Sequence, residues 1–501
     1  MTPDEWRVLL NSRLAERRPR VELYTAYREG NHRLAFATSK FKEAFGDLFE
    51  AFATNWCALV VDSAVERLRV EGFRFGDAQE ADDDAWAIWQ ANRLDSESIK
   101  AHTEAVTNET AYVLASPPRT GEDMPRLTIE HPLQCIVEHD PADRSRRLAA
   151  LKRYVDANGD LVEVVYEPDQ ITTFRQDGAL NRVLGFGLVI PTGVPLSPSA
   201  SVTVENPLGV VPMVPLENNP DLMTGGTSDL KPAISLNDAA NKFFSDMIVA
   251  SEFQAFRQRV LSGVEIPVDP DTGNPLNTIE MAVSRLMVFE DPDAKAYDLP
   301  QGDLSNYVQA IDLAVQHLAA QTRTPPHYLL AKLVNLSGDA LKAAESGLIA
   351  RVERKQTDFS DGWEEAVRLA FKWRSLHRQS TNEAGAALDA ERAEQFDAET
   401  VWAPAETQAP GVISDSLVKK AQIGWPQEKL WAEGGMSPTE IKRAREMADQ
   451  AGSKLTKEDV EARRAAGIPW EFIWGEMGYS EAEQKEIARL SPFTTPEAIA
   501  V

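Results

Sequence analysis

The chain is organised around residues 324–374, which read TPPHYLLAKLVNLSGDALKAAESGLIARVERKQTDFSDGWEEAVRLAFKWR. Apolar residues recur there at helical spacing: Leu341, Ala344, Leu348, Ile349, Val352, Phe359, Trp363, Val367 and Ala370. This period predicts one helix over residues 337–374, roughly 57 Å long at about 1.5 Å per residue. Gly347 and Gly362 interrupt the pattern. Because glycine costs about 1 kcal/mol against alanine in a helix, we expect a bend at these two positions.

A second helix is predicted just before this one. Its apolar positions are Tyr307, Ile311, Ala314, Val315, Leu318 and Ala319. It stops before Pro325, because proline lacks the N–H group and restricts the residue in front of it. The loop between the two helices carries Pro325, Pro326, His327, Tyr328, Lys332, Asn335 and Ser337. Two long helices joined by a polar loop indicate two rod-like helices whose connecting loop contacts a partner.

The composition is that of a protein with several domains and no membrane span. The 501 residues suffice for two to four domains, and the longest apolar stretch, 184–190, is far shorter than the roughly 18 residues of a spanning helix. The N-terminus, MTPDEWRVLLNSRLAERR, reads as the start of an amphipathic helix. This pattern differs from that of a signal peptide, so we expect none. Two cysteines, Cys57 and Cys135, fit a reducing compartment, and we expect buried thiols.

The net charge of −26 excludes a tight general DNA binder. A protein that holds DNA is basic, because its cations must replace the counterions on the phosphates. One interpretation of the acidic composition is solubility alone. Another is that an anionic surface lets a polyanion slide past without sticking.

The N-terminal half changes from helical to β-rich. Residues 1–115 read as mostly helical. Within them, one helical face carries Phe41, Phe45, Phe49 and Phe52. Residues 55–75 suggest an apolar helix that ends near Gly72. Residues 125–215 contain short β-branched segments, with Asp156-Ala157-Asn158-Gly159 as a hairpin turn. The fold class predicted is therefore α+β, predominantly helical.

A third helix is predicted over residues 228–263, with Lys242, Arg257 and Arg259 off its apolar stripe. About forty residues of strand-like pieces follow, around the turn DPDTGNP at 269–275. They form a small insert between two long helices, with Asp269, Asp271, Asn274 and Arg285 as its polar positions.

The C-terminus contains an internal repeat with an offset of 43 residues. The pattern G-x-P-x-E-x-x-W-x-E-x-G-x-S-x-x-E occurs at 424–440 and again at 467–483, with Trp431 and Trp474 at matching positions. Proline starts a short helix, tryptophan is buried on one face, and glycine ends it before the next serine cap. Two such helical hairpins suit a contact surface better than an active site.

Sequence motifs for catalysis are missing from the chain. There is no P-loop, H-E-x-x-H, C-x-x-C or G-x-S-x-G pattern. The pairs Glu130-His131 and Glu138-His139 are the only metal-ligand candidates we weigh, and both lie beside proline or aspartate at the ends of strand-like segments. We expect no catalytic residue, metal or cofactor.

The order of segments and four motifs resemble the portal proteins, or head-to-tail connectors, of tailed double-stranded DNA phages. The motifs are YREGNHRLAFATSKFKEAFGDLFEAFATNWCALVVDSAVERLRVEGF (27–73), ENPLGVVPMVPLENNP (205–220), ASEFQAFRQR (250–259) and QTRTPPHYLL with SGDALKAAESGL (321–348). They are similar to portals of siphophages that infect actinobacteria. The resemblance implies a wing at 1–230, a stem helix at 231–263, a clip at 264–304, a second stem helix at 305–324, a tunnel loop at 325–337, a long wing helix at 338–375, further wing or linker at 376–409 and a helical crown at 410–501.

The resemblance further implies a ring, usually of twelve copies, at one capsid vertex in the virion, assembled in the host cytoplasm. Double-stranded DNA would pass through it without sequence specificity, during packaging and ejection. The terminase large subunit, then a head–tail adaptor, would dock on it, beside the major capsid and scaffolding proteins. Lys332, Lys242, Arg257 and Arg259 are candidates for weak phosphate contacts, with a solvated surface or an intersubunit salt bridge as the alternative for each.

Two other functions stay open from the sequence. A scaffold or minor capsid protein would use the C-terminal repeat as its docking surface. A carboxylate-metal nuclease would depend on Glu130 and His131.

Overall fold

A computed structural model describes residues 1–31, 54–76, 81–176, 200–223, 225–255, 259–262, 295–298, 303–330 and 338–406, with a few residues between 417 and 445. The chain divides into two compact units. The first contains residues 1–69 and 84–399, and the second contains residues 70–83 and 400–501.

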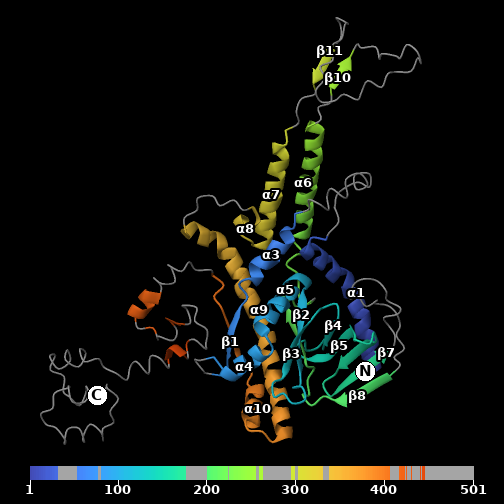
Figure 1. Cartoon of the computed structure of the whole chain (residues 1–501), viewed down its shortest axis with the longest axis vertical. Helices are drawn as coiled ribbons and strands as arrows, with labels where there is room; N and C mark the ends of the chain where they lie inside the picture. The colour runs from blue at the N-terminus through green and yellow to red at the C-terminus, as the bar shows by residue number, and fades with distance from the viewer. Residues whose placement is uncertain are drawn as a thin grey trace, which may run out of the picture. The chain divides into compact units, whose positions relative to one another are not determined.

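Helices make up much of the first unit (Figure 1). They are α1 (Pro3–Glu29), α3 (Trp56–Val65), α4 (Asp83–Ala91), α5 (Leu94–Asn108), α6 (Ile234–Ala255), α7 (Ser305–Thr322), α8 (Pro326–Leu330), α9 (Gly338–Thr381) and α10 (Ala386–Glu394). The ends of α1 show why such a segment becomes helical. Thr2 and Glu5 form a reciprocal capping box at its start, and Gly30, at φ 79°, closes it in the left-handed conformation.

Two antiparallel sheets form the β part of the first unit. One has the order β3-β2-β9 and the other β4-β5-β6-β7-β8. Their strands are β2 (Thr110–Ser116), β3 (Arg126–Glu130), β4 (Cys135–His139), β5 (Arg147–Val155), β6 (Leu161–Tyr166), β7 (Gln170–Gln176), β8 (Ala200–Glu205) and β9 (Met213–Glu217). The β-rich region and its hairpin are confirmed, because Val155 pairs with Leu161 around Gly159 at φ 84°. The fold class is confirmed as mixed α+β.

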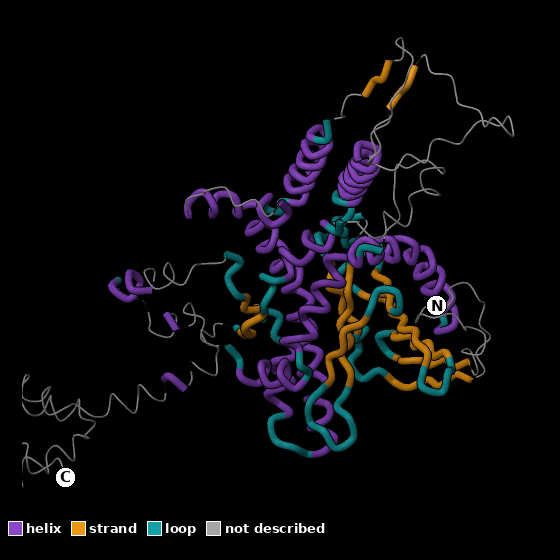
Figure 2. The backbone as a smooth tube through the Cα atoms, turned by 45° about the horizontal axis from the view of Figure 1, so that its top comes forward, coloured by secondary structure: helices purple, strands orange, loops and turns teal. Residues whose placement is uncertain are grey.

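The five-stranded sheet is covered on both faces at its centre, whereas every residue of β8 is exposed. Trp6, Leu10 and Leu14 of α1 pack on one face, against side chains that include Leu151 and Phe174. On the other face, Cys135 and Ala150 pack against Tyr112, Leu114 and Met213 of the three-stranded sheet. Figure 2 shows the two sheets and the helices beside them. Cys57 and Cys135 are both buried free thiols, as the sequence predicts.

Helix α9 is a central packing element of the first unit. It is one continuous helix of 44 residues, longer than predicted, and it packs against α3, β2, β9 and α10. Its apolar stripe is buried from position 348 onward, at Leu348, Val352, Phe359, Trp363, Val367 and Ala370. The ribbon of α9 is curved rather than straight in Figure 1. Gly362 has a packing role, because a Cβ there would meet Leu216 Cδ2 at 2.5 Å and Pro215 O at 3.1 Å.

Two helices end earlier than the sequence predicts. The apolar helix expected to reach Gly72 stops at Val65, where Arg67 and Leu68 make turn bonds to Ala64 and Val65. Residues Val70–Arg74 then form β1, which pairs with β12 (Glu399–Trp402). An apolar run of this length fits a buried strand as well as a helix, which is why periodicity did not separate them.

The helix expected over residues 228–263 is likewise shorter. It is α6, which ends at Ala255, and Arg259–Ser262 form strand β10, paired with β11 (Lys295–Asp298). Arg259 therefore lies on a strand and not on the helix, which corrects the prediction for this residue.

His102 of α5 is buried in the aromatic contact between α5 and α9. Its Nε2 accepts a hydrogen bond from Trp363 Nε1 at 2.9 Å, and its ring stacks on Phe359 with centroids 5.2 Å apart. Burial lowers the pKa of His102 to about 3, although a hydrogen bond with the Leu68 backbone opposes the shift. The neutral imidazole is therefore the form that the folded protein holds.

Gly362→Ala should destabilise the fold by about 1–3 kcal/mol, because the added methyl group meets the buried Leu216 and a backbone carbonyl. Gly347→Ala is the matched control in the same helix. A Cβ at position 347 meets Arg323 only at 3.6 Å, so alanine should be neutral or stabilise by up to about 1 kcal/mol. Urea unfolding followed by tryptophan fluorescence measures both. Equal effects at the two positions would contradict the packing role of Gly362.

Stability should fall as the pH drops from about 6.5 toward 3, because the unfolded chain binds a proton at His102 that the folded chain excludes. One such group gives a slope of at most about 1.4 kcal/mol per pH unit. Unfolding free energies of the wild type and His102→Gln, measured from pH 8 to 4.5, isolate this contribution. Glutamine keeps an acceptor for Trp363 but does not titrate, so the two curves should converge at low pH. Stability curves that stay parallel over this pH range would rule out His102 as the source of the pH dependence.

Candidate functional site: the base of the paired helices

Helices α6 and α7 lie side by side and run in opposite directions (Figures 1 and 2). Among the described side chains of the two helices, full burial occurs only at the base of the pair, near the start of α6 and the end of α7. On α6, no side chain from Asp246 to Ser251 is buried, and on α7 none from Ser305 to Leu313 is. Toward the base, Val315 and Leu318 are fully covered.

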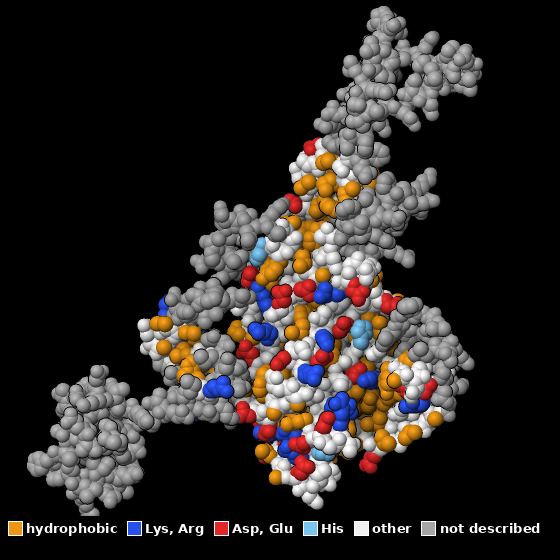
Figure 3. Space-filling model, viewed as in Figure 1, with side chains coloured by type: hydrophobic (Ala, Val, Ile, Leu, Met, Phe, Trp, Pro, Cys, Tyr) orange, Lys and Arg blue, Asp and Glu red, His pale blue; other side chains and the backbone are white. Residues whose placement is uncertain are grey.

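Apolar side chains remain exposed along this pair. Phe243 is 36% exposed on α6, and Val308 and Leu313 are 48% and 56% exposed on α7. Figure 3 shows hydrophobic side chains gathered on the visible face of the two helices. An apolar stripe on a helix normally packs against another structural element, so we infer that a binding partner covers this surface.

The base of α6 is attached through polar side chains. Asn241 bonds both to the backbone N and to the backbone O of Thr54, each at 2.8 Å. Asn237 accepts from the Trp56 backbone N at 3.3 Å, and Asp238 accepts from the Tyr27 hydroxyl. These bonds join α6 to the start of α3 and the end of α1. Because hydrogen bonds are directional, they fix the rotation of α6 about its axis.

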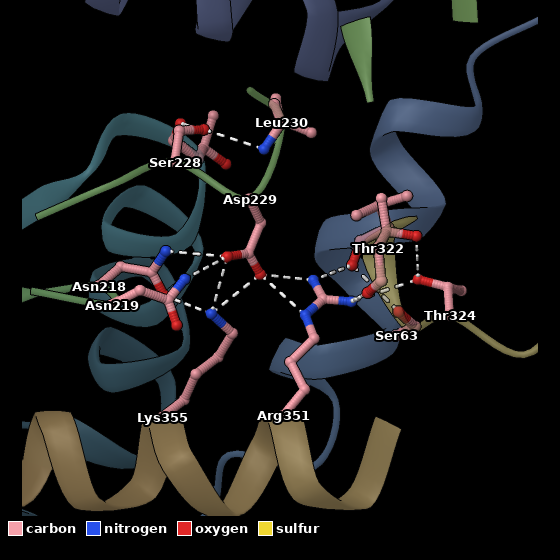
Figure 4. A network of polar contacts seen from close by, with 12 residues as sticks. Ser63, Asn218, Asn219, Ser228, Asp229, Leu230, Thr322, Thr324, Arg351 and Lys355 are labelled. Atoms are coloured by element: carbon pink, nitrogen blue, oxygen red, sulfur yellow. Dashed lines mark hydrogen bonds and ion pairs between the residues drawn. The ribbon is translucent and has the colours of Figure 1, made fainter. Parts of the chain in front are cut away.

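A buried ionic network joins the other elements at this base (Figure 4). Asp229, just before α6, binds Arg351 of α9 through Oδ2 and Lys355 of α9 through Oδ1 at 2.9 Å. Arg351 also donates to Thr322 O at the end of α7, at 3.0 Å, and to Val60 O of α3, at 2.9 Å. One carboxylate and two cations thus connect three helices, α3, α7 and α9, to the segment that leads into α6.

The asparagines after β9 complete the network. Asn218 and Asn219 donate to Asp229 Oδ1 at 3.0 and 2.7 Å, and Lys355 also donates to Asn218 Oδ1. Burial alone would raise the pKa of Asp229, but the charges of Arg351 and Lys355 outweigh it and hold the pKa well below its usual range. Burial lowers the pKa of Lys355, and the nearby carboxylate only partly opposes this.

The segment predicted as a polar loop begins with a short helix, α8. His327 and Tyr328 lie on it, so the prediction of a loop at these residues is wrong. Arg67 donates to the Tyr328 hydroxyl at 2.9 Å and to Glu345 of α9 at 3.2 Å, and His327 Nε2 lies 3.8 Å from the same carboxylate. Trp56 Nε1 donates to Leu329 O at 3.3 Å. A double proline can start a helical turn as well as end a helix, which explains the error.

The structure describes two of the four predicted phosphate-contacting cations, Lys242 and Arg259. Lys242 forms an i, i+4 ion pair with Asp246 on α6, and Arg259 lies on β10. Predicted positions outside the described residues are Arg257, Lys332, Asn335, Ser337, Asp269, Asp271, Asn274, Arg285, Trp474 and the four phenylalanines at 41–52. Trp431 is described and is partly buried. The predicted phosphate contacts therefore stay predictions.

The candidate metal ligands bind other side chains. Glu130 pairs with Lys152, His131 Nε2 lies 3.2 Å from Glu104, and Glu138 pairs with Arg13. Among the described residues, no group of three or more His, Cys, Asp or Glu side chains is placed to hold a metal ion.

The paired helices, their polar base and α9 all lie within one family match. Residues 10–380 match the model of the phage portal proteins described as SPP1 Gp6-like. The chain belongs to this family of phage portal proteins. It is 34% identical over 379 residues to a portal protein of Mycobacterium phage D29, covering 70% of this chain and 74% of that protein. It is 33% identical over 380 residues to a portal protein of Mycobacterium phage L5, with the same coverage.

Membership in the portal family confirms a structural component of the virion rather than an enzyme. The nuclease alternative is therefore set aside. The C-terminal repeat at 424–483 lies beyond the family match, which ends one residue before the end of α9. Within the described parts of the portal chain, no helix is both long and apolar enough to cross a membrane.

Sequence reasoning missed the ionic network of the portal chain, although one signal was present. Lys355 occupies a position on the apolar stripe between Val352 and Phe359, and Arg351 precedes it by one helical turn. A charged residue on a core-facing stripe indicates a buried partner. The sequence does not show that the partner is Asp229, more than a hundred residues earlier.

Asp229→Asn should destabilise the portal chain by about 3–5 kcal/mol, because it leaves two buried cations without a carboxylate. Lys355→Met should cost less, since Arg351 still balances Asp229. The double variant should cost less than the sum of the two, because only one cation is then left unpaired. Urea unfolding measures all three.

The matched control for this cycle is Glu97→Gln, which breaks the exposed pair with Lys100. It should cost less than about 1 kcal/mol. Strictly additive effects of the Asp229 and Lys355 substitutions would contradict the network.

Proposed function

We propose that this chain forms a closed ring, usually of twelve copies, at one vertex of the capsid. Double-stranded DNA passes through the ring during packaging and ejection, without sequence recognition. The observation that carries the proposal is the helix pair α6/α7, which is buried at its base and carries exposed Phe243, Val308 and Leu313 above it. In a ring, each pair is covered by the pairs of the neighbouring copies.

The net charge supports a conduit rather than a DNA-holding protein. The formal charge of each copy is −26, so a ring of copies repels phosphate over most of its surface. A few cations are enough to moderate this repulsion, and Lys332, Lys242, Arg257 and Arg259 stay our candidates. Lys242 has to exchange Asp246 for a phosphate, which weakens any contact that it makes.

The assignment of segments to parts of the ring follows the family resemblance. We propose that α6 and α7 are the stem helices, residues 264–304 the clip, and residues 410–501 the crown. Residues 325–337, which begin with helix α8, correspond to the tunnel loop. Residues 1–230 and 338–409 form the wing. The terminase large subunit docks on the clip during packaging, and a head–tail adaptor replaces it later. The major capsid and scaffolding proteins are further partners.

The place of action proposed is the portal vertex of the virion, after assembly in the host cytoplasm. The two Mycobacterium phage relatives support a siphophage-type virus with an actinobacterial host.

Electron microscopy of the purified protein tests the ring, and annular particles with a central hole are expected. Leu313→Asp, on the exposed face of α7, should leave a folded monomer because a charge then replaces the covered side chain. Leu388→Asp is the matched control, because Leu388 is similarly exposed, at 50%, but lies on α10. It should still form rings. A wild-type protein that stays monomeric at assembly concentrations would overturn the proposal.

A further inference from the structure

The turn between β9 and α6 presents two adjacent apolar side chains to solvent. Leu222 is 91% exposed and Met223 is 86% exposed, more than any other large hydrophobic side chain in the described parts of the chain. Single exposed apolar residues are ordinary on a protein surface. Two neighbours that are almost fully exposed at one tip are not, and they point to a contact.

Hydrogen bonds hold the backbone of this turn next to the two side chains. Asp221 N donates to Gly225 O at 3.0 Å, and Met223 N donates to Asp221 Oδ1 at 2.6 Å. Gly225 adopts φ 80°, and Arg144 donates to the Leu222 carbonyl from a different loop. The backbone that carries the two side chains is therefore hydrogen-bonded, so binding at this tip requires less ordering of the backbone than binding at an unbonded loop.

The same turn is fastened to the base of the paired helices. Its first residues, Asn218 and Asn219, donate to Asp229 Oδ1, the carboxylate that binds Arg351 and Lys355. A partner that contacts Leu222 and Met223 thus contacts a segment joined directly to the buried network.

The surroundings of the tip restrict the class of partner. Asp221 belongs to the turn itself, the Glu217 carboxylate lies beside Gly225, and the Arg144 guanidinium donates to the Leu222 carbonyl, so two carboxylates stand against one cation. Nucleic acid and anionic membranes carry phosphate, so acidic neighbours disfavour both. The tip instead fits an apolar surface on a protein.

The size of the ring contact argues that this protein is another copy of the chain. A stable interface buries about 800 Å² on each partner. The most exposed apolar side chains described on α6 and α7, Phe243, Val308 and Leu313, supply on the order of 200 Å² of this area, and contacts elsewhere on the chain can add to it. A ring also needs two different surfaces on each copy, because its contacts run head to tail. Leu222 and Met223 supply a second surface at the base of the same helices.

We propose that Leu222 and Met223 form a knob that packs against an apolar surface of the neighbouring copy in the ring. The inference rests on the ring assembly proposed above. It adds the residues that hold one copy to the next at the base of the helix pair, and a direct path from that contact to Asp229.

The first test is the double variant Leu222→Ser/Met223→Ser, with Leu388→Ser as the matched control. Sedimentation of the purified full chain over a concentration series gives the concentration of half-assembly. We expect an increase of at least about tenfold for the double variant and less than about twofold for the control. Circular dichroism and the melting temperature should not change, since both side chains already face water. Assembly of the double variant at the wild-type concentration would refute the knob.

The second test uses Met223→Cys labelled with a thiol-reactive benzophenone. The native thiols of Cys57 and Cys135 are fully buried, so the label goes to position 223. Illumination should give covalent dimers in the assembled sample and none in a dilute monomeric one. An assembled sample without dimers would refute the contact while the ring still stands. A wild-type chain that never assembles would instead refute the ring, and the knob with it.

Discussion

The carboxylate of Asp229 is the group on which the arrangement of the first unit depends. It lies where β9, the start of α6, the end of α7 and the middle of α9 come together, and it binds Arg351 and Lys355 there. In a buried environment with an effective dielectric constant near 20, each close pair contributes about 4 kcal/mol of Coulomb energy. That energy offsets the desolvation of the charges only because every partner is also hydrogen-bonded, through Asn218, Asn219 and backbone carbonyls. The two cations lie one turn apart on α9, so a single rigid helix positions both.

A joint of this kind specifies an orientation as well as a contact. Apolar side chains can slide over one another at little cost, whereas Asn241 satisfies the Thr54 backbone at both N and O in only one register. The same holds for Asn237 on Trp56 and for Asp238 on Tyr27. Helix α6 is therefore held at a defined angle and rotation where it leaves the body. Identical copies need such precision to close a ring, because a small error in each copy accumulates around the circle.

The sequence predicted those parts of this arrangement that depend on local pattern. The apolar stripe of α9, the helix α7 and the hairpin at Gly159 follow from periods of 3.6 and 2 and from turn chemistry. The ends of α3 and α6 were placed too late, because an apolar segment such as Val70–Arg74 does not reveal whether it pairs as a strand until its partner is known. Gly362 was expected to bend a helix, whereas its actual constraint is the approach of Leu216 from a distant strand. Asp229 gave no local signal, since its partners are set by tertiary packing alone.

The acidic net charge and the exposed apolar side chains of α6 and α7 are compatible properties of one protein. A free chain with Phe243, Val308 and Leu313 exposed is prone to unspecific association, and a net charge of −26 opposes it by repulsion between copies. That repulsion is long-range but screened within about 8 Å at physiological salt, whereas apolar contact acts only when surfaces touch in register. In the ring proposed above, this combination favours association only where the geometry set at the base of α6 brings matching apolar surfaces together. The charge that opposes unspecific association of free copies is also the charge that DNA would meet in the proposed ring, so one composition would serve both states.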